Sequence, residues 1–265
     1  MGDVLERAMV GVGLMAGSAN VIMQLGRPPV GYGVLESRVD SGNLFKHPLK
    51  RARTTGTYLA VAALGTDEER AAYRRAVNRS HVHVKSTADS PVAYNAFDPA
   101  LQLWVAACLY KGLEDVHTAF FGGGPPARLY AEAAVLGTTL QVKPEMWPRD
   151  REAFAAYWRC GLEEVRIDER TRAYLRDIVD LKFLPQPFPL VFGAFHRFVT
   201  TGFLPAEFRE QMHLRWSAAD QRRFERLTRA VGFVVRRLPV AVRQFPYNAY
   251  LRDLRRRRRA GRPLV

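Results

Sequence analysis

The sequence predicts an all-α protein of one domain, with roughly nine or ten helices. Apolar residues recur at the three- and four-residue spacing of a buried helix face, and no stretch alternates with the period of two that is typical of strands. Prolines, glycines and short polar residues stand where helices would begin and end. With 265 residues, 48% hydrophobic and 25% charged, the chain is long enough to bury one large core.

The first 25 residues are mildly apolar and rich in glycine, and we expect them to form a helix packed into the domain. They lack the basic segment and compact apolar core of a signal peptide, and their apolar part is too short to cross a membrane. Residues 31–47 read as a polar connection, because Gly33, Asp40 and Asn43 interrupt any apolar period.

Two helices with a stop between them follow. Pro48 suits a first helical position, and Gly65 suits a residue just beyond a helix end. Thr66 and Glu69 have the spacing of a capping box that opens the second helix. The apolar stripe of this second helix predicts that it continues to Val84.

The polar residues of this pair can be assigned to faces. His81 falls on the apolar stripe and is predicted to point inward, whereas His83 is nearly opposite and points to solvent. On the preceding helix Arg51, Thr54 and Thr55 share one stripe with apolar neighbours. A buried arginine and a buried histidine need partners, so these residues either satisfy one another and the backbone or face a bound group.

The remaining helices are predicted from capping signals. Asp98 caps a long helix to about Phe121, and Asp168 caps a later one. Further helices are expected over 128–140, 150–162, 190–204, 217–238 and 246–259. The helix over 190–204 is expected to be buried, with His196 as a hydrogen-bonded core residue.

The cysteines and the charge constrain the function further. Two cysteines, Cys108 and Cys160, are too few for a disulfide framework and fit a reducing cytoplasm. From residue 221 onward the chain has fourteen arginines and only two acidic residues, so most of the net charge of +14 belongs to this end. We therefore expect a domain over 1–250 and a solvated basic tail over 251–265. An anionic membrane surface is the second interpretation of this tail. Nucleic acid is not expected as a partner, because no aromatic residues are interleaved with the arginines.

Several stretches, in this order along most of the chain, resemble the MpaB-type oxygenases of actinobacterial type, to which the latex-clearing rubber oxygenases are related. They are Gln24–Val30 followed by Gly33–Val34, Pro48–Thr55, Asn78–Val84, Ala96–Leu101 followed by Trp104–Val105, Met146–Pro148 with Phe154 and Tyr157–Trp158, and Leu204–Pro205 with Arg209 and Trp216–Ser217.

The resemblance implies a cofactor and roles for particular residues. It implies a globin-like core and a haem b whose iron is held by His81, with Arg51 and Thr55 on the side where dioxygen binds. Thr54 stands where the rubber oxygenases carry a lysine. Glu36 is a candidate base, by its similarity in position to a glutamate upstream of the distal arginine.

The function that follows is a haem-dependent oxygenase for an apolar substrate of isoprenoid or lipid type, with cleavage of a carbon–carbon double bond as the implied reaction. The sequence departs from the family pattern at Arg27, Asn78 and Ala106. An alternative is therefore a haem- or lipid-binding protein with a retired active site. A third interpretation, a non-haem metal site on His81 and His83, requires a strand there and conflicts with the helical period.

Overall fold

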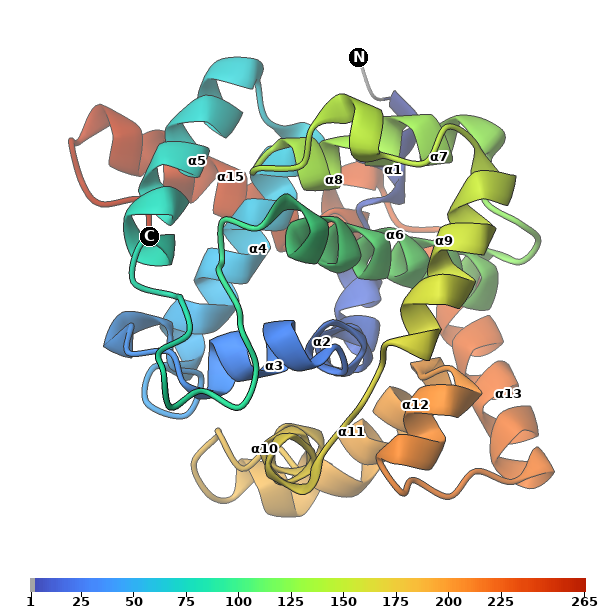
Figure 1. Cartoon of the computed structure of the whole chain (residues 1–265). Coiled ribbons are helices and arrows are strands. Elements are labelled where there is room, and N and C mark those ends of the chain that lie inside the picture. Colours follow the sequence, from blue (N-terminus) through green and yellow to red (C-terminus); the bar gives the residue numbers. More distant parts are fainter. Residues whose placement is uncertain (1–2) are drawn as a thin grey trace.

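The computed structural model describes residues 3–265, and all the secondary-structure elements in that range are helices (Figure 1). The predicted all-α class is confirmed. Nine α-helices have nine or more residues, close to the predicted number, and shorter ones connect them. The α-helices are α1 (Asp3–Ala8), α2 (Gly17–Leu25), α3 (Pro28–Leu35), α4 (Pro48–Leu64), α5 (Asp67–His81), α6 (Pro99–Phe121), α7 (Ala127–Ala133), α8 (Val135–Thr138), α9 (Arg151–Glu163), α10 (Glu169–Val179), α11 (Phe188–Phe203), α12 (Ala206–Gln211), α13 (Ala218–Val235), α14 (Val240–Arg243) and α15 (Tyr247–Arg259). The 3-10 helices are η1 (Gly11–Ala16), η2 (Asp40–Gly42) and η3 (Pro144–Met146).

Helix α6 runs through the middle of the molecule and carries much of the core (Figure 1). Asp98 caps it by accepting a hydrogen bond from the amide of Ala100 at 2.8 Å, as predicted. Helices α2, α8 and α13 pack against it. The Asn20 side chain donates to the Cys108 carbonyl at 2.6 Å, and Gly112 leaves room for that amide. A helix surrounded in this way can hold neighbouring side chains in fixed positions.

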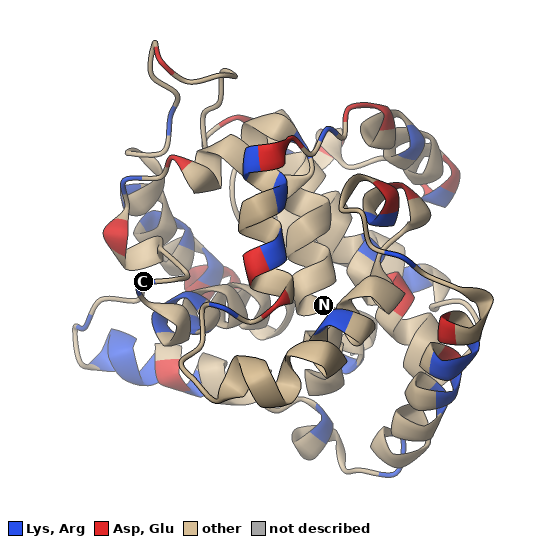
Figure 2. Cartoon of the chain, turned by 90° about the horizontal axis from the view of Figure 1, so that it is seen from below, with Lys and Arg blue, Asp and Glu red and all other residues tan. Residues whose placement is uncertain are grey.

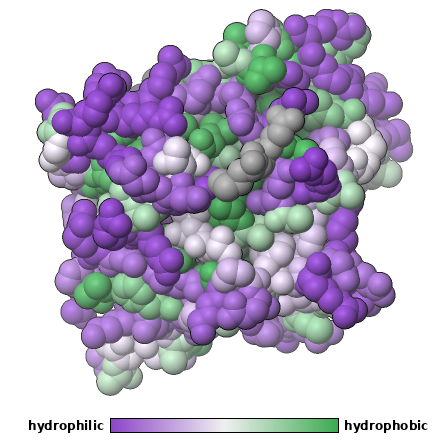
Figure 3. All heavy atoms as spheres, turned by 90° about the horizontal axis from the view of Figure 1, so that it is seen from above, coloured by the Kyte–Doolittle hydropathy of each residue, from purple (hydrophilic) through white to green (hydrophobic). Residues whose placement is uncertain are grey.

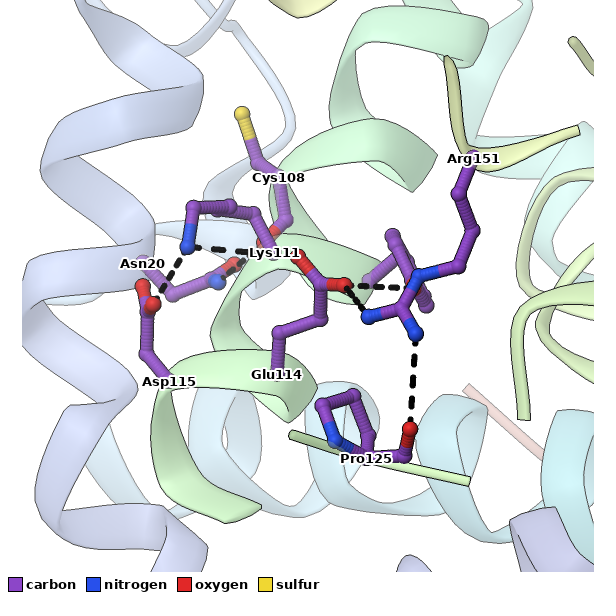
Figure 4. A network of polar contacts seen from close by, with 8 residues as sticks. Asn20, Cys108, Lys111, Glu114, Asp115, Pro125 and Arg151 are labelled. Atoms are coloured by element: carbon purple, nitrogen blue, oxygen red, sulfur yellow. Dashed lines mark hydrogen bonds and ion pairs between the residues drawn. The ribbon is translucent and has the colours of Figure 1, made fainter. Parts of the chain in front are cut away.

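A polar network joins α6 to α9 (Figure 4). Lys111 forms an ion pair with Asp115 on the same helix, and Glu114 accepts a hydrogen bond from Arg151 at 2.7 Å. Arg151 also donates to the carbonyl of Pro125, at 3.4 Å. These contacts attach the start of α9 to the far end of α6.

The two central helices begin where their sequence predicts. Helix α4 has Pro48 at its first position and ends before Gly65. Both hydrogen bonds of the Thr66–Glu69 capping box are present, at 2.9 and 3.2 Å. The end of α5 differs from the prediction: the helix stops at His81, so Val84 lies in the following turn.

Three further predictions are wrong in their bounds. The expected N-terminal helix is divided into α1, η1 and α2: Val10 is extended, and the backbone of Phe245 packs directly on Gly11, the first residue of η1. Residues 1–2 lie outside the described part. The expected connection from residue 31 begins with most of α3. The helix expected over 128–140 is split into α7 and α8.

Helix α11 was expected to be buried, but its first half is exposed. Phe203 and the neighbouring residues at its C-terminal end are in the core. The exposed apolar side chains of its first half are Phe188, Leu190, Val191, Phe192 and Phe195. His196 is hydrogen-bonded as predicted, to Ser18 at 3.0 Å and to the Val179 carbonyl at 2.8 Å.

The C-terminal basic segment is not a separate solvated tail. Residues 251–259 are the second part of α15, which packs along α4 with Leu251 and Leu254 buried. Arg255 forms an ion pair with Glu69 at 2.7 Å, and Arg258 forms one with Glu68. The reason is that Tyr247, Leu251 and Leu254 follow one another at spacings of four and three residues, so this side of the helix faces the core, while Arg255 and Arg258 meet the acidic first turn of α5.

Charge and hydropathy are distributed unevenly over the surface. Figure 2 shows acidic and basic positions interspersed over most helices, with a dense basic stretch on the C-terminal helix. The face around the N-terminus is largely hydrophilic, with separate apolar patches (Figure 3). Within residues 3–265 no helix has the length and apolar character needed to span a bilayer.

Candidate active site

A largely apolar cavity lies between α3, α4, α5, α6 and the loop 82–98 that joins α5 to α6. It contains about 1230 Å³ of space not filled by atoms, its open mouth included. Val84, Tyr94, Asn95 and Ala96 of this loop belong to the lining, and Figure 1 shows the loop running past α3. The polar residues that line it are Gln24, Arg51, Thr54, Thr55, Tyr58, Tyr73, His81, Tyr94, Asn95 and Gln102. Pockets that are mainly apolar with a few convergent polar groups are typical of ligand sites.

His81 faces this cavity from the last turn of α5. Neither ring nitrogen has a hydrogen-bond partner among the described residues, and Nδ1 is fully buried. Burial, and then the charge of Arg51, lowers the pKa of His81 to about 4. The imidazole is therefore neutral at pH 7, which is the form that binds metals. His83 is exposed and outside the cavity lining, as predicted.

Arg51 is the one cationic side chain among the cavity-lining residues. The Arg51 residue has a large solvent-accessible surface, yet protein atoms surround its guanidinium, and this burial lowers the guanidinium pKa. Both observations hold because the exposed surface belongs to the cavity. No carboxylate or other described side chain pairs with it. An unpaired cation in the interior attracts anionic or polarisable ligands.

The two threonines of α4 are not equivalent. Thr54 donates its hydroxyl to the Lys50 carbonyl at 2.9 Å, one turn back on the same helix. Thr55 lines the cavity and its hydroxyl has no partner among the described residues. Thr55 is thus the hydroxyl available to a ligand beside Arg51.

Glu36 does not line the cavity with Arg51. Its carboxylate accepts hydrogen bonds from Ser90 at 2.7 Å and Tyr94 at 3.0 Å, and it pairs with Arg170 at 3.2 Å. These bonds, chiefly that from Ser90, lower the pKa of Glu36. The carboxylate fastens the loop over the cavity. The sequence did not predict this role of Glu36, nor that Tyr94 would bond to it. The only signal for Tyr94 was an aromatic residue within a polar loop.

Removing the carboxylate should loosen the loop. In Glu36→Ala, Ser90 and Tyr94 lose their common acceptor, so we expect trypsin to cleave after the exposed Lys85 on the order of tenfold faster. Glu152→Ala, an exposed carboxylate on α9, is the control and should keep the wild-type rate. Equal cleavage of all three proteins would show that Glu36 does not hold the loop.

The pH dependence of stability should report on His81. Its pKa is about 4 in the folded protein and 6.5 in the unfolded chain. As pH falls below 6.5, the unfolded chain binds a proton there that the folded protein does not, so stability is lost until about pH 4. We expect His81→Phe to reduce the loss of unfolding free energy between pH 7 and pH 5 by at most about 2 kcal/mol, as measured by urea denaturation of the haem-free protein. An unchanged loss would show that the folded imidazole is solvated.

The three residues that depart from the family pattern make their contacts outside the cavity. Arg27 forms an ion pair with Glu164 and lies over the Trp104 ring at 5.7 Å. Asn78 accepts a hydrogen bond from Gln141 at 2.7 Å. Ala106 is buried in the core. None of the three belongs to the cavity lining.

The two-histidine metal site is not formed. His81 faces the cavity whereas His83 is exposed outside its lining. Among residues 3–265 no group of three or more His, Cys, Asp or Glu side chains is placed to hold a metal ion.

Comparison with known proteins identifies the family to which the chain belongs. Residues 7–233 match the family described as ER-bound oxygenase mpaB/B′/rubber oxygenase, catalytic domain. An uncharacterized protein of Mycobacterium bovis and one of Mycobacterium tuberculosis are each 54% identical over 251 residues, covering 94% of this chain and 98% of the relative. No solved structure matches.

Proposed function

Because the chain belongs to the family of mpaB-type and rubber oxygenase catalytic domains, we propose that it is a haem-dependent oxygenase that oxidises an apolar substrate in this cavity. One observation carries the proposal. A neutral, unpartnered His81 and an unpaired Arg51 face the same apolar cavity.

The residues present fit a haem b in three respects. His81 has an imidazole that is unprotonated at pH 7 and already inside the fold. The apolar walls suit a macrocycle, and the unpaired Arg51 suits a group that carries carboxylates or binds dioxygen. Burying polar atoms without partners costs about 1–3 kcal/mol each, so a ligand that satisfies them stabilises the fold.

In this proposal the iron, when bound, supplies the oxidative chemistry, and the chain orients the reactants. His81 holds the group. The Arg51 guanidinium stabilises negative charge that develops beside it, and the free Thr55 hydroxyl donates a hydrogen bond there. The apolar lining excludes water and accepts a substrate of isoprenoid or lipid type.

Absorption spectroscopy with added haemin tests the proposal. We expect a bound-form Soret band at one haem per chain, and dioxygen consumption when the reduced protein meets an unsaturated isoprenoid such as squalene. No Soret band would reject haem binding. A Soret band without turnover of isoprenoid or lipid substrates would favour the alternative, a haem-binding protein with a retired site.

Arg51→Met should separate the distal role from a structural one. Since Arg51 has no ion-pair partner, we expect the haem-free variant to unfold within about 0.5 kcal/mol of wild type or to be more stable. Haem should still bind, because His81 is intact, while carbon monoxide and dioxygen affinities change. Loss of folding would instead assign Arg51 a structural role.

A further inference from the structure

The end of α13 and the segment that follows it expose apolar and basic side chains together. The six exposed apolar residues are between 37% and 62% exposed: Phe233, Val234, Leu238, Val240, Val242 and Phe245. Residues 226–247 contain five arginines and no aspartate or glutamate: Arg226, Arg229, Arg236, Arg237 and Arg243. We call residues 226–245 the α13–α14 surface.

The arginines of this surface have no acidic partners. No ion pair involves any of them in the described part of the chain. Arg236 donates to the Phe121 carbonyl at 3.0 Å, and Arg237 lies over the Phe233 ring with its guanidinium carbon 3.4 Å from the ring centre. The positive charges of the four exposed arginines are therefore available to an anionic partner, whereas the Nε atom of Arg243 is buried.

Phe233 shares one stripe with three of the arginines. Arg226, Arg229, Phe233 and Arg237 follow one another at spacings of three and four residues, which places them along one outer stripe of α13 and its continuation. Figure 1 shows α13 at the edge of the molecule. About 100° round the helix from Phe233, Gly232 packs against the backbone of Phe120, so α13 lies close to α6 at this point.

The rest of the surface is also anchored from behind. The Gln244 side chain donates to the Glu6 carbonyl at 3.0 Å, and the Phe245 backbone packs on Gly11. The Phe245 ring nevertheless points to solvent. Because the backbone is anchored, these outward-facing apolar side chains can insert into an apolar environment without unfolding of the protein.

We propose that the α13–α14 surface binds the face of an anionic lipid bilayer, with its apolar side chains at the acyl boundary and its arginines at the headgroups. Basic and apolar residues on one side are typical of segments that lie in a membrane interface. The inference concerns docking and is independent of haem chemistry.

Two other surfaces fit less well. On α15, Arg255 and Arg258 are paired with Glu69 and Glu68, which reduces their attraction to lipid. The exposed apolar half of α11 lies beside Lys182 and Arg197, which are paired with Asp177 and Asp180. Helix α15 also carries Arg252 and Arg259 without an ion pair in the described part of the chain, but it has no exposed large apolar side chain. Of these three surfaces, the α13–α14 surface is the one that combines unpaired arginines with exposed apolar side chains.

Sedimentation of the full chain with vesicles tests the proposal. Wild type should bind vesicles of 70% phosphatidylcholine and 30% phosphatidylglycerol, and bind pure phosphatidylcholine much less. Arg236→Gln/Arg237→Gln should weaken binding to the anionic vesicles by at least about tenfold, and added salt should do the same. The matched control, Arg256→Gln/Arg259→Gln, removes the same charge from α15 and should bind almost as wild type.

Phe233→Ser/Phe245→Ser tests the apolar part, with circular dichroism to confirm folding and Phe192→Ser/Phe195→Ser on α11 as its control. Only the first pair should weaken binding. The proposal is overturned if the α15 or α11 variants lose binding and the α13–α14 variants keep it. It is equally overturned if wild type ignores lipid charge, or if Phe233→Ser/Phe245→Ser converts a solution dimer to a monomer without affecting vesicles.

Discussion

His81→Ala is expected to weaken haem binding more than about 100-fold, so that the bound-form Soret band disappears in a haemin titration. His83→Ala should leave the band unchanged. The two histidines have the same intrinsic chemistry, and only their positions differ: His81 lines the cavity and His83 is exposed. His83→Ala is thus a matched control for loss of an imidazole two residues away.

Other outcomes would each identify a different error. Loss of the band in both variants would indicate that His83 also contributes, and loss in neither would exclude His81 as the ligand. The iron ligand would then be one of the other histidines. His196 is hydrogen-bonded to Ser18, His47 is hydrogen-bonded to Asp40, and His213 is exposed. His117 is left, and its buried Nδ1 has no partner among the described residues.

Leu254→Ala is expected to lower the free energy of unfolding by about 2–5 kcal/mol, measured by urea denaturation. Leu254 is only 1% exposed where α15 packs on α4, and truncation leaves a cavity between the two helices. Arg256→Ala, on the exposed side of the same helix, should change stability by less than about 0.5 kcal/mol.

Arg255→Ala extends this test to the charged residues of the segment. It leaves Glu69, which is buried, without its ion-pair partner, so it should destabilise more than Arg256→Ala. If Leu254→Ala and Arg255→Ala both unfolded like wild type, residues 251–265 would be the solvated tail that their charge alone predicts.

The starts of helices could be predicted because capping is local. Asp98, Asp150, Asp168 and Ser217 each bond to a backbone amide two or three residues away, so the signal and the structure share the same few residues. The facing direction of His81 was predictable for a similar reason, since most of its stripe lies within α5.

Predictions failed where the deciding contact came from far along the chain. Glu36 holds the loop through Ser90 and Tyr94, more than fifty residues away. The arginine run of α15 finds Glu68 and Glu69 at a separation of more than 180 residues. No local pattern contains either partner.

The sequence by itself determined that this protein is all-α, where most of its helices begin, and that His81 turns inward while His83 turns outward. Only the tertiary structure decided that His81, Arg51 and Thr55 share one cavity, that Glu36 fastens the loop over it, and that the C-terminal arginines pack on α5. Helix caps and helix faces depend on neighbours within a few residues, whereas cavities and ion pairs depend on which distant segments the packing of the core brings together.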